Sequence, residues 1–335
     1  MDATGTNSTG TMINAPPYPG RPGSQASLGS MALTMDNEKL FKPRPVPNFL
    51  IVGAARAGTT SLWYWLRRHP QVFMAHYKEP AFFTHNFGVF TQEQYLSLFK
   101  AGRGKPCIGE ASTAYLSAPE SPSWIHEVLG NVKIIVILRN PVERAYSMYC
   151  WMVMNGLEPV ETFAEALNQE GRRMASLEFH QNCPISFRDY QYFNAGLYID
   201  KVRPYINIFG ADQVKIWLFD DLKNDPAGFC ANVCHFLGIS SVPGHVLRRE
   251  NGGVIPRSIP LQYRLRTMRF RTRKRFGQSD RLLTCWYVMA MLINKARGTK
   301  KPMAPAIRAQ LVEGYRTSVE QLSDLIRRDL SHWLT

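Results

Sequence analysis

A short apolar strand that runs into a glycine loop and a helix constrains the fold of this chain more than any other feature. Asn48–Gly53 (NFLIVG) is apolar along almost its whole length, which is typical of a strand buried in a parallel sheet. Gly53–Ser61 (GAARAGTTS) follows, and Thr59–Arg68 predicts a helix that stops before Pro70. Such a unit directs backbone N–H groups and a helix N-terminus at one point, so it predicts an anion-binding loop.

The alternation of strand and helix continues along the chain. Val132–Leu138 and Val214–Phe219 are further apolar runs of strand length, and they precede helical patterns at Pro141–Met154 and Pro226–Leu237. Asn140 stands where an N-cap is expected, before a proline at the first helical position. This order predicts an α/β fold, a P-loop-like central parallel sheet flanked by helices, with ligands at the carboxyl ends of the strands.

The N-terminal segment differs in composition from the rest. Residues 1–45 are rich in Gly, Ser, Thr and Pro, which predicts a disordered leader, and residues 46–335 are expected to form a single domain. Residues 1–30 lack the basic start and apolar run of a signal peptide. The longest apolar run, near Leu282–Ile293, is too short to span a bilayer. We therefore expect a soluble, cytoplasmic protein, and the sequence leaves its oligomeric state open.

The charge of the chain points to an anionic partner. Lys plus Arg number 40 against 26 Asp plus Glu, which gives a net charge of +14. Such a surplus suits a nucleotide, an acidic glycan, nucleic acid or a membrane surface. The basic stretch Arg264–Arg275 concentrates it, and a solvated helix face is an equally weighted interpretation of that stretch. The six cysteines show no metal-site spacing, so free thiols and no metal are expected.

The glycine loop lacks the lysine of a nucleoside triphosphatase. Gly53 and Gly58 have the Walker A spacing, but Thr59 and Thr60 stand where Lys and Ser/Thr would be, and Arg56 is the one cation of the loop. The Walker lysine and magnesium neutralise a triphosphate during phosphoryl transfer. A sulfuryl group carries less charge, so one guanidinium with hydroxyl and backbone donors can serve it without metal. The alternative is an ordinary turn with a surface arginine.

A second predicted anion site follows the strand Val132–Leu138. A triphosphatase often has a metal-binding Asp there, whereas this chain has Arg139, whose guanidinium fork suits a phosphate. Ser147, two turns into the next helix, adds a hydroxyl. Two neighbouring anion sites suit a nucleotide with phosphates at both its 5′ and 3′ positions. The alternative is an arginine that caps the carbonyls of the sheet.

With both motifs, the chain resembles the sulfotransferases that use 3′-phosphoadenosine 5′-phosphosulfate (PAPS). GAARAGTTS is similar to their 5′-phosphosulfate loop and LRNPVERAYSMY to their 3′-phosphate motif, and further matches extend over residues 48–260, including KEPAFF at Lys78–Phe83 and GEASTAY at Gly109–Tyr115. The resemblance implies donor-binding roles for Arg56, Ala57, Gly58, Thr59, Thr60, Ser61, Arg139 and Ser147, and it assigns Arg257 to closing over the nucleotide.

The KEPxFF motif is similar to that of the bacterial and glycosaminoglycan-type enzymes. By this resemblance Glu79 is the catalytic base, and Arg56, which replaces the usual lysine, is the second catalytic residue. Ala111 stands where glycosaminoglycan enzymes often have a lysine, which favours the bacterial-type branch. We expect in-line, metal-free transfer of the sulfuryl group to a hydroxyl or amine of a carbohydrate or small-molecule acceptor, with an acidic acceptor as one option.

Rival interpretations remain open from the sequence alone. His76 and His85 are competing candidates for the base, although a lone histidine is more often structural. An ATP-dependent P-loop kinase is a second enzyme class, which the missing Walker lysine disfavours. A non-catalytic module that binds anions or nucleic acid would use the basic stretch but needs neither Glu79 nor paired phosphate sites, and no nucleic-acid partner is expected.

Overall fold

The computed structural model describes residues 45–85, 88, 91–242, 256–276, 281–294 and 302–335. The predicted leader, residues 1–45, lies outside the described residues except for residue 45. Its disorder and its boundary with the domain therefore stay predictions.

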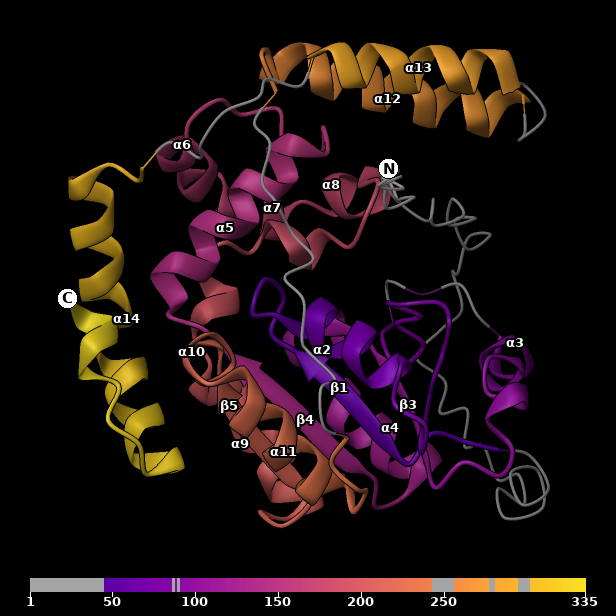
Figure 1. Ribbon diagram of the computed structural model, residues 1–335. Coiled ribbons are helices and arrows are strands. Elements are labelled where there is room, and N and C mark those ends of the chain that lie inside the picture. The colour runs from indigo at the N-terminus through magenta and orange to yellow at the C-terminus, as the bar shows by residue number, and fades with distance from the viewer. Residues whose placement is uncertain (1–44, 86–87, 89–90, 243–255, 277–280, 295–301) are drawn as a thin grey trace, which may run out of the picture.

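Five parallel strands form the centre of the molecule, in the order β2-β3-β1-β4-β5 (Figure 1). They are β1 (Phe49–Gly53), β2 (Val72–Met74), β3 (Cys107–Ala111), β4 (Lys133–Leu138) and β5 (Val214–Leu218). All of β1 is buried, and its Ile51 pairs with Ala111 of β3 and Ile135 of β4. A strand with neighbours on both sides and helices on both faces needs a continuous apolar run. The predicted parallel α/β fold is confirmed.

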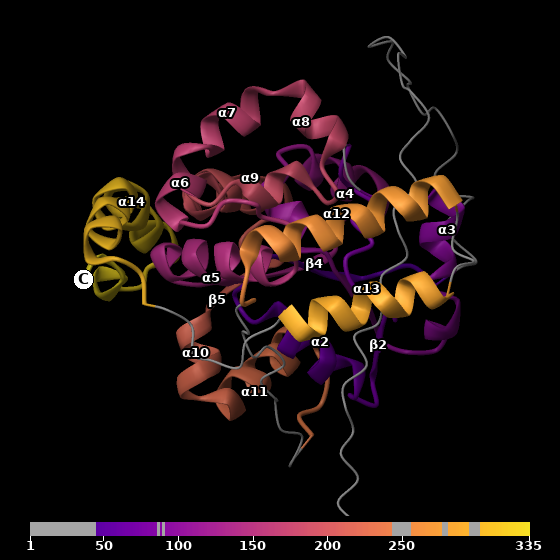
Figure 2. The same ribbon diagram turned by 90° about the horizontal axis from the view of Figure 1, so that it is seen from above.

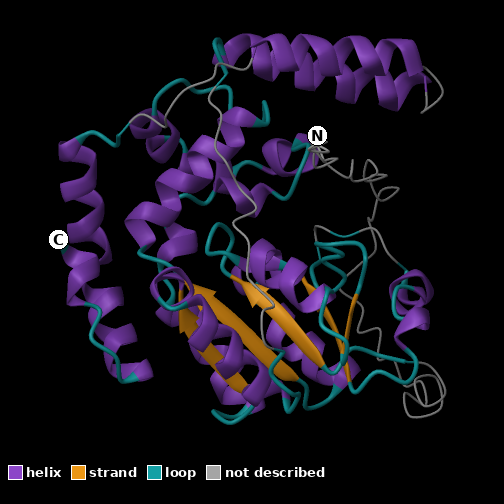
Figure 3. Ribbon diagram, in the orientation of Figure 1, coloured by secondary structure: helices purple, strands orange, loops and turns teal. Residues whose placement is uncertain are grey.

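Helices cover both faces of this sheet (Figure 3). The helices of the described residues are α2 (Thr59–Arg67), α3 (Gln92–Ser97), α4 (Ser121–Leu129), α5 (Pro141–Met154), α6 (Phe163–Asn168), α7 (Glu170–Ala175), α8 (Leu177–Asn182), α9 (Ile199–Phe209), α10 (Phe219–Asn224), α11 (Pro226–Leu237), α12 (Ile259–Phe276), α13 (Arg281–Asn294) and α14 (Pro305–Ile326). The ends of α2 and α11 meet on one face, where a ring nitrogen of His69 lies 2.9 Å from Ser240 O. On the other face α4 packs against α9, with the rings of His126 and Phe209 5.5 Å apart.

The predicted elements are confirmed with one correction. Val214–Phe219 was expected to be a single strand, but β5 ends at Leu218 and Phe219 begins α10. The cause is local, because the Asp221 carboxylate accepts a hydrogen bond from Leu218 N at 2.9 Å and so starts a helix.

Two C-terminal units lie outside these layers. α14 packs against α5 and α9, and the Tyr315 hydroxyl donates to Phe193 O at 2.9 Å. α12 and α13 lie side by side as a helical hairpin at the edge of the molecule (Figures 1 and 2). The hairpin is attached near the end of α5, where Gln262 Nε2 donates to Met154 O at 3.1 Å.

Candidate active site

The predicted glycine loop turns sharply between β1 and α2. Ala54 N donates to Ile137 O of β4 at 2.8 Å, which ties the loop to the neighbouring strand. Gly58 is the N-cap of α2 with φ 92°, and a Cβ there would lie 3.1 Å from the Leu222 side chain, so both conformation and space favour glycine. No side chain caps this helix, which leaves the N–H groups of Thr59–Ser61 to face an anion.

The two predicted anion motifs meet at the carboxyl ends of β1 and β4. Arg56 Nε donates to Ser147 Oγ of α5 at 3.4 Å, and Arg139 NH1 donates to Arg56 O at 3.2 Å. Asn140 caps α5 as expected, with its side-chain oxygen 3.0 Å from Val142 N. The structure therefore brings together Arg56, Arg139 and Ser147, which lie far apart in the sequence, and their donor-binding roles stay a prediction.

The two guanidinium groups of this site repel each other in a largely buried setting. Burial, and then the positive charge of Arg139, lower the pKa of Arg56 to about 10. Burial also lowers the pKa of Arg139, against the opposing effect of Glu143, whose carboxylate lies 3.9 Å away. Two partly desolvated cations beside an open helix N-terminus form a strongly electropositive site, and a bound anion would relieve their repulsion.

Glu79 lies at the carboxyl end of β3, on the other side of β1 from β4. Its backbone is left-handed, with φ 63°, and Glu79 N donates to Ala111 O at 2.9 Å. Its carboxylate accepts hydrogen bonds from Thr113 N at 2.6 Å and from Thr113 Oγ1 at 3.1 Å, and it pairs with Lys78. A non-glycine residue with positive φ is strained, and such strain is common at functional sites.

A small cavity extends from the loop to the Glu79 side of the site. Among the residues that line it are Ala54, Ala55, Thr113, Arg144, Arg188 and Asp189. Its volume of about 10 Å³ admits a single water. Arg144 is only 2% exposed, and both Arg144 Nε and Arg188 NH1 are buried without a hydrogen-bond partner in the described part of the chain.

Asp189 is a second carboxyl group near Glu79. Burial, and then the negative charge of Glu79, raise the pKa of Asp189 from 3.8 to about 7, against the opposing effect of Arg144. The sequence analysis missed Asp189 and Arg188, because they belong to a 3₁₀ turn (Phe187–Tyr190) without a recognisable motif. It also missed Thr113 as a partner of Glu79, although Thr113 lies within the matched GEASTAY segment. Perturbed carboxyl groups of this kind are typical of functional sites.

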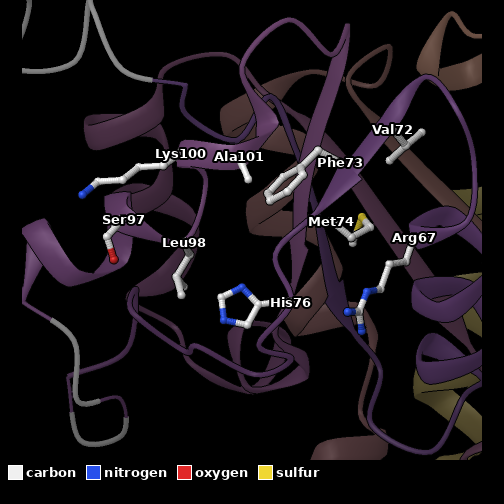
Figure 4. A pocket seen from close by; sticks show the side chains of 9 residues that line it. All are labelled: Arg67, Val72, Phe73, Met74, His76, Ser97, Leu98, Lys100 and Ala101. Carbon is white, nitrogen blue, oxygen red and sulfur yellow. The ribbon is translucent and has the colours of Figure 1, made fainter.

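Neither of the two competing histidines lines this cavity. His76 points into a separate cavity of about 400 Å³ beside β2, lined also by Arg67, Phe73 and Leu98 and by no residue of the glycine loop (Figure 4). The ring of His85 stacks on Trp124 with centroids 5.2 Å apart. Of the three candidates for the base, the structure places Glu79 next to Thr113 and close to Asp189.

The geometry neither supports nor contradicts the donor-binding role predicted for Arg257 or the prediction that the protein uses no metal. Arg257 is exposed at the foot of the α12–α13 hairpin, where its backbone N–H donates to Asn294 O. No hydrogen bond or ion pair among the described residues joins its guanidinium to the glycine loop. Within the same residues, no group of three or more His, Cys, Asp or Glu side chains is placed to hold a metal.

The remaining expectations concern the cysteines and membrane-spanning helices. All six cysteines are free thiols, and those of α11, Cys230 and Cys234, are buried as expected. None of the helices in the described part of the chain is both long and apolar enough to cross a bilayer. The expected cytoplasmic location stays a prediction.

This chain is similar to known proteins in both sequence and fold. Membrane-associated sulfotransferase kil1 of Dictyostelium discoideum is 32% identical over 131 residues, 37% of this chain and 28% of that protein. Heparan sulfate glucosamine 3-O-sulfotransferase 3A1 of Mus musculus is 26% identical over 221 residues, 65% of this chain and 51% of that protein. Carbohydrate sulfotransferase 15 of Mus musculus is 26% identical over 260 residues, 60% of this chain and 45% of that protein. In these alignments the chain spans about a quarter to a half of each relative.

A solved structure and a family match extend this likeness. The crystal structure of a sulfotransferase from Alicyclobacillus acidocaldarius has a TM-score of 0.64 and 28% identity, covering 87% of this chain and 99% of that chain. The family described as "Sulfotransferase domain" matches residues 46–250. These findings confirm the predicted resemblance and fold over the kinase alternative, and the chain belongs to the sulfotransferase family.

Proposed function

We propose that this protein transfers the sulfuryl group from PAPS to a hydroxyl group of a carbohydrate acceptor. The observation that carries the proposal is the meeting of Arg56, Arg139 and Ser147 at the uncapped N-terminus of α2. This arrangement offers two neighbouring anion sites on one sheet edge, as a nucleotide with phosphates at both ends requires.

Each side of the site has a separate task. The segment Arg56–Ser61 holds the 5′-phosphosulfate, and Arg139 with Ser147 holds the 3′-phosphate. The acceptor hydroxyl gives its proton to Glu79 while its oxygen bonds to sulfur, and the bond from sulfur to the 5′-phosphate oxygen of the donor breaks. Arg56 stabilises the charge that develops on this leaving oxygen. The fixed cations supply the charge that magnesium supplies in a kinase, so the reaction needs no metal.

The acceptor class is drawn from the relatives and from the charge of the chain. Two of the relatives are named for heparan sulfate and carbohydrate acceptors, and this chain has a net charge of +14. Both features favour a glycan, including an acidic one, as the acceptor. An amine or a small-molecule hydroxyl is the second candidate.

Transfer of radiolabelled sulfate from PAPS to a panel of glycans, with EDTA present, tests the proposal. We expect labelled glycan at an undiminished rate in EDTA. A strict requirement for magnesium would contradict metal-free transfer. Tight binding of the product 3′,5′-bisphosphate (PAP) without transfer to any glycan would instead contradict the acceptor class and leave the donor site intact.

A further inference from the structure

The hairpin helix α13 turns an apolar face outward. Its exposed large side chains are Trp286, Met289, Leu292 and Ile293, with exposed fractions of 55%, 57%, 52% and 66%. At about 100° per residue, these four positions fall within an arc of about 120° on one side of the helix. Side chains in such an arc usually face the core of a globular protein, so their exposure calls for a partner.

The opposite face of α13 holds the helix to the molecule. Tyr287 and Asn294 are both buried on this side. Asn294 Nδ2 donates to Ser258 O at 2.8 Å and to Gln262 Oε1 at 2.9 Å. Polar contacts therefore anchor the inner side of α13 at this end, while its outer side is apolar. This distribution is the reverse of that in an ordinary surface helix.

The neighbouring helix α12 is strongly basic in sequence. From Arg264 to Arg275 it has seven basic residues and no acidic one. Leu261, Arg264 and Met268 are exposed, so apolar and basic side chains are mixed on its outer surface. The hairpin lies along the top edge of the molecule in Figure 1 and across the front of the view in Figure 2.

An anionic phospholipid surface matches both features at once. Apolar side chains enter the boundary between headgroups and acyl chains, while arginines bind the headgroup phosphates. A second copy of this chain would bring two arginine-rich helices together, which charge repulsion opposes. A nucleic acid or an acidic glycan would bind the arginines but would leave the apolar side of α13 exposed. With 14 residues, α13 is shorter than the roughly 20 residues that span a bilayer, so it would lie in the membrane plane.

We propose that the α12–α13 hairpin docks this protein on an anionic phospholipid surface through the outward face of α13. The inference does not depend on the proposed transferase activity. Docking of this kind is peripheral and reversible, because a short amphipathic helix does not cross the bilayer.

Co-sedimentation of the full chain with vesicles tests the apolar part of this proposal. We expect binding to phosphatidylcholine vesicles that contain phosphatidylserine, and a loss of about tenfold or more in affinity for the double variant Met289→Ser/Ile293→Ser. Leu177→Ser is the matched control, since Leu177 is 75% exposed on α8, outside the hairpin. Both variants should unfold at the same urea concentration as the wild type, which shows that they fold.

Arginine substitutions test the contribution of the basic helix α12 to vesicle binding. Arg264→Gln should weaken binding to these vesicles several-fold, and Arg172→Gln, an exposed arginine on α7, should not. Equal binding of the double variant and the wild type would overturn the proposal, as would equal binding to vesicles without phosphatidylserine. A change from dimer to monomer in the double variant by light scattering, with vesicle binding unchanged, would overturn it in favour of a second copy of this chain.

Discussion

The donor side and the acceptor side of the site are built in different ways. On the donor side, Arg139 directly follows the buried strand β4 and Arg56 lies in the loop three residues after the end of β1, and the hydrogen bond from Arg139 to Arg56 O joins the two segments. On the acceptor side, Glu79, Thr113 and Asp189 come from three separate loops and turns. A residue at a strand end has its position fixed by the sheet, whereas a loop residue depends on contacts that no local pattern encodes.

The largest expected effect concerns the acceptor side. Glu79→Gln keeps the shape of the side chain but removes the proposed base, so turnover should fall by about 10²–10⁴-fold at saturating PAPS. Binding of PAP should stay within about twofold of the wild type, because the donor-side residues are unchanged. Steady-state kinetics together with calorimetry measure both quantities. Lost PAP affinity with normal turnover at saturation would place Glu79 on the donor side instead.

Glu110 is the matched comparison for Glu79. It lies in β3 directly before Ala111, and its side chain is more buried than that of Glu79. It is fully buried and accepts hydrogen bonds from Tyr115 OH at 2.6 Å and Ser112 Oγ at 2.7 Å. Burial raises the pKa of Glu110 from 4.5 to about 7, against the effect of these hydrogen bonds. We therefore assign Glu110 a role in stability.

The pH dependence of unfolding tests this role. The folded state holds the Glu110 proton more tightly than the unfolded state, so its contribution is complete below about pH 4.5 and is lost as the pH rises to about 7. The loss amounts to about 3 kcal/mol of unfolding free energy. Glu110→Gln should remove this share of the pH dependence in urea titrations, with turnover retained, while the raised pKa of Asp189 leaves its own share in the same pH range. A turnover loss as large as that of Glu79→Gln would mean that Glu110 takes part in the reaction.

On the donor side, we expect a substitution to weaken nucleotide binding more than it lowers turnover. Arg139→Gln should weaken PAP binding by about 1.5–3 kcal/mol, the scale of a hydrogen bond to a charged group. Binding of AMP, which lacks the 3′-phosphate, should change much less. Calorimetry with both nucleotides measures the difference, and Arg172→Gln on α7 controls for the loss of one positive charge. Equal affinity of the wild type for PAP and AMP would remove the assignment of Arg139 to the 3′-phosphate.

The same contrast, between residues placed by the sheet and residues placed by loops, explains which parts of the molecule the sequence predicts. The strands β1, β4 and β5 and the helices α2, α5 and α11 follow from apolar runs, Asn140, Pro141 and the glycines, and the structure confirms them within a residue or two. The meeting of Arg56 with Ser147 was predictable because parallel strands end at one edge. Thr113 and Asp189 were not, since 3₁₀ turns of four or five residues are too short to show a periodic pattern and their contacts bridge 34 residues or more. The outward apolar face of α13 was equally hidden, because an apolar run alone does not show which side is covered.

Asp189 gives the smallest expected effect and the finest test of the acceptor side. Its pKa of about 7, raised first by burial and then by Glu79, means that it gains its negative charge near neutral pH. This charge attracts the proton that the acceptor gives up, so wild-type turnover at saturating PAPS should rise by about two- to fivefold through pH 7. Asp189→Asn should lose this rise while its turnover below pH 6 and its PAP affinity stay close to those of the wild type. A substitution that acted only through folding would lower turnover at every pH. If Asp189→Asn kept the full wild-type pH profile, the two carboxyl groups would act independently, and the acceptor side would contain one functional acid instead of a coupled pair.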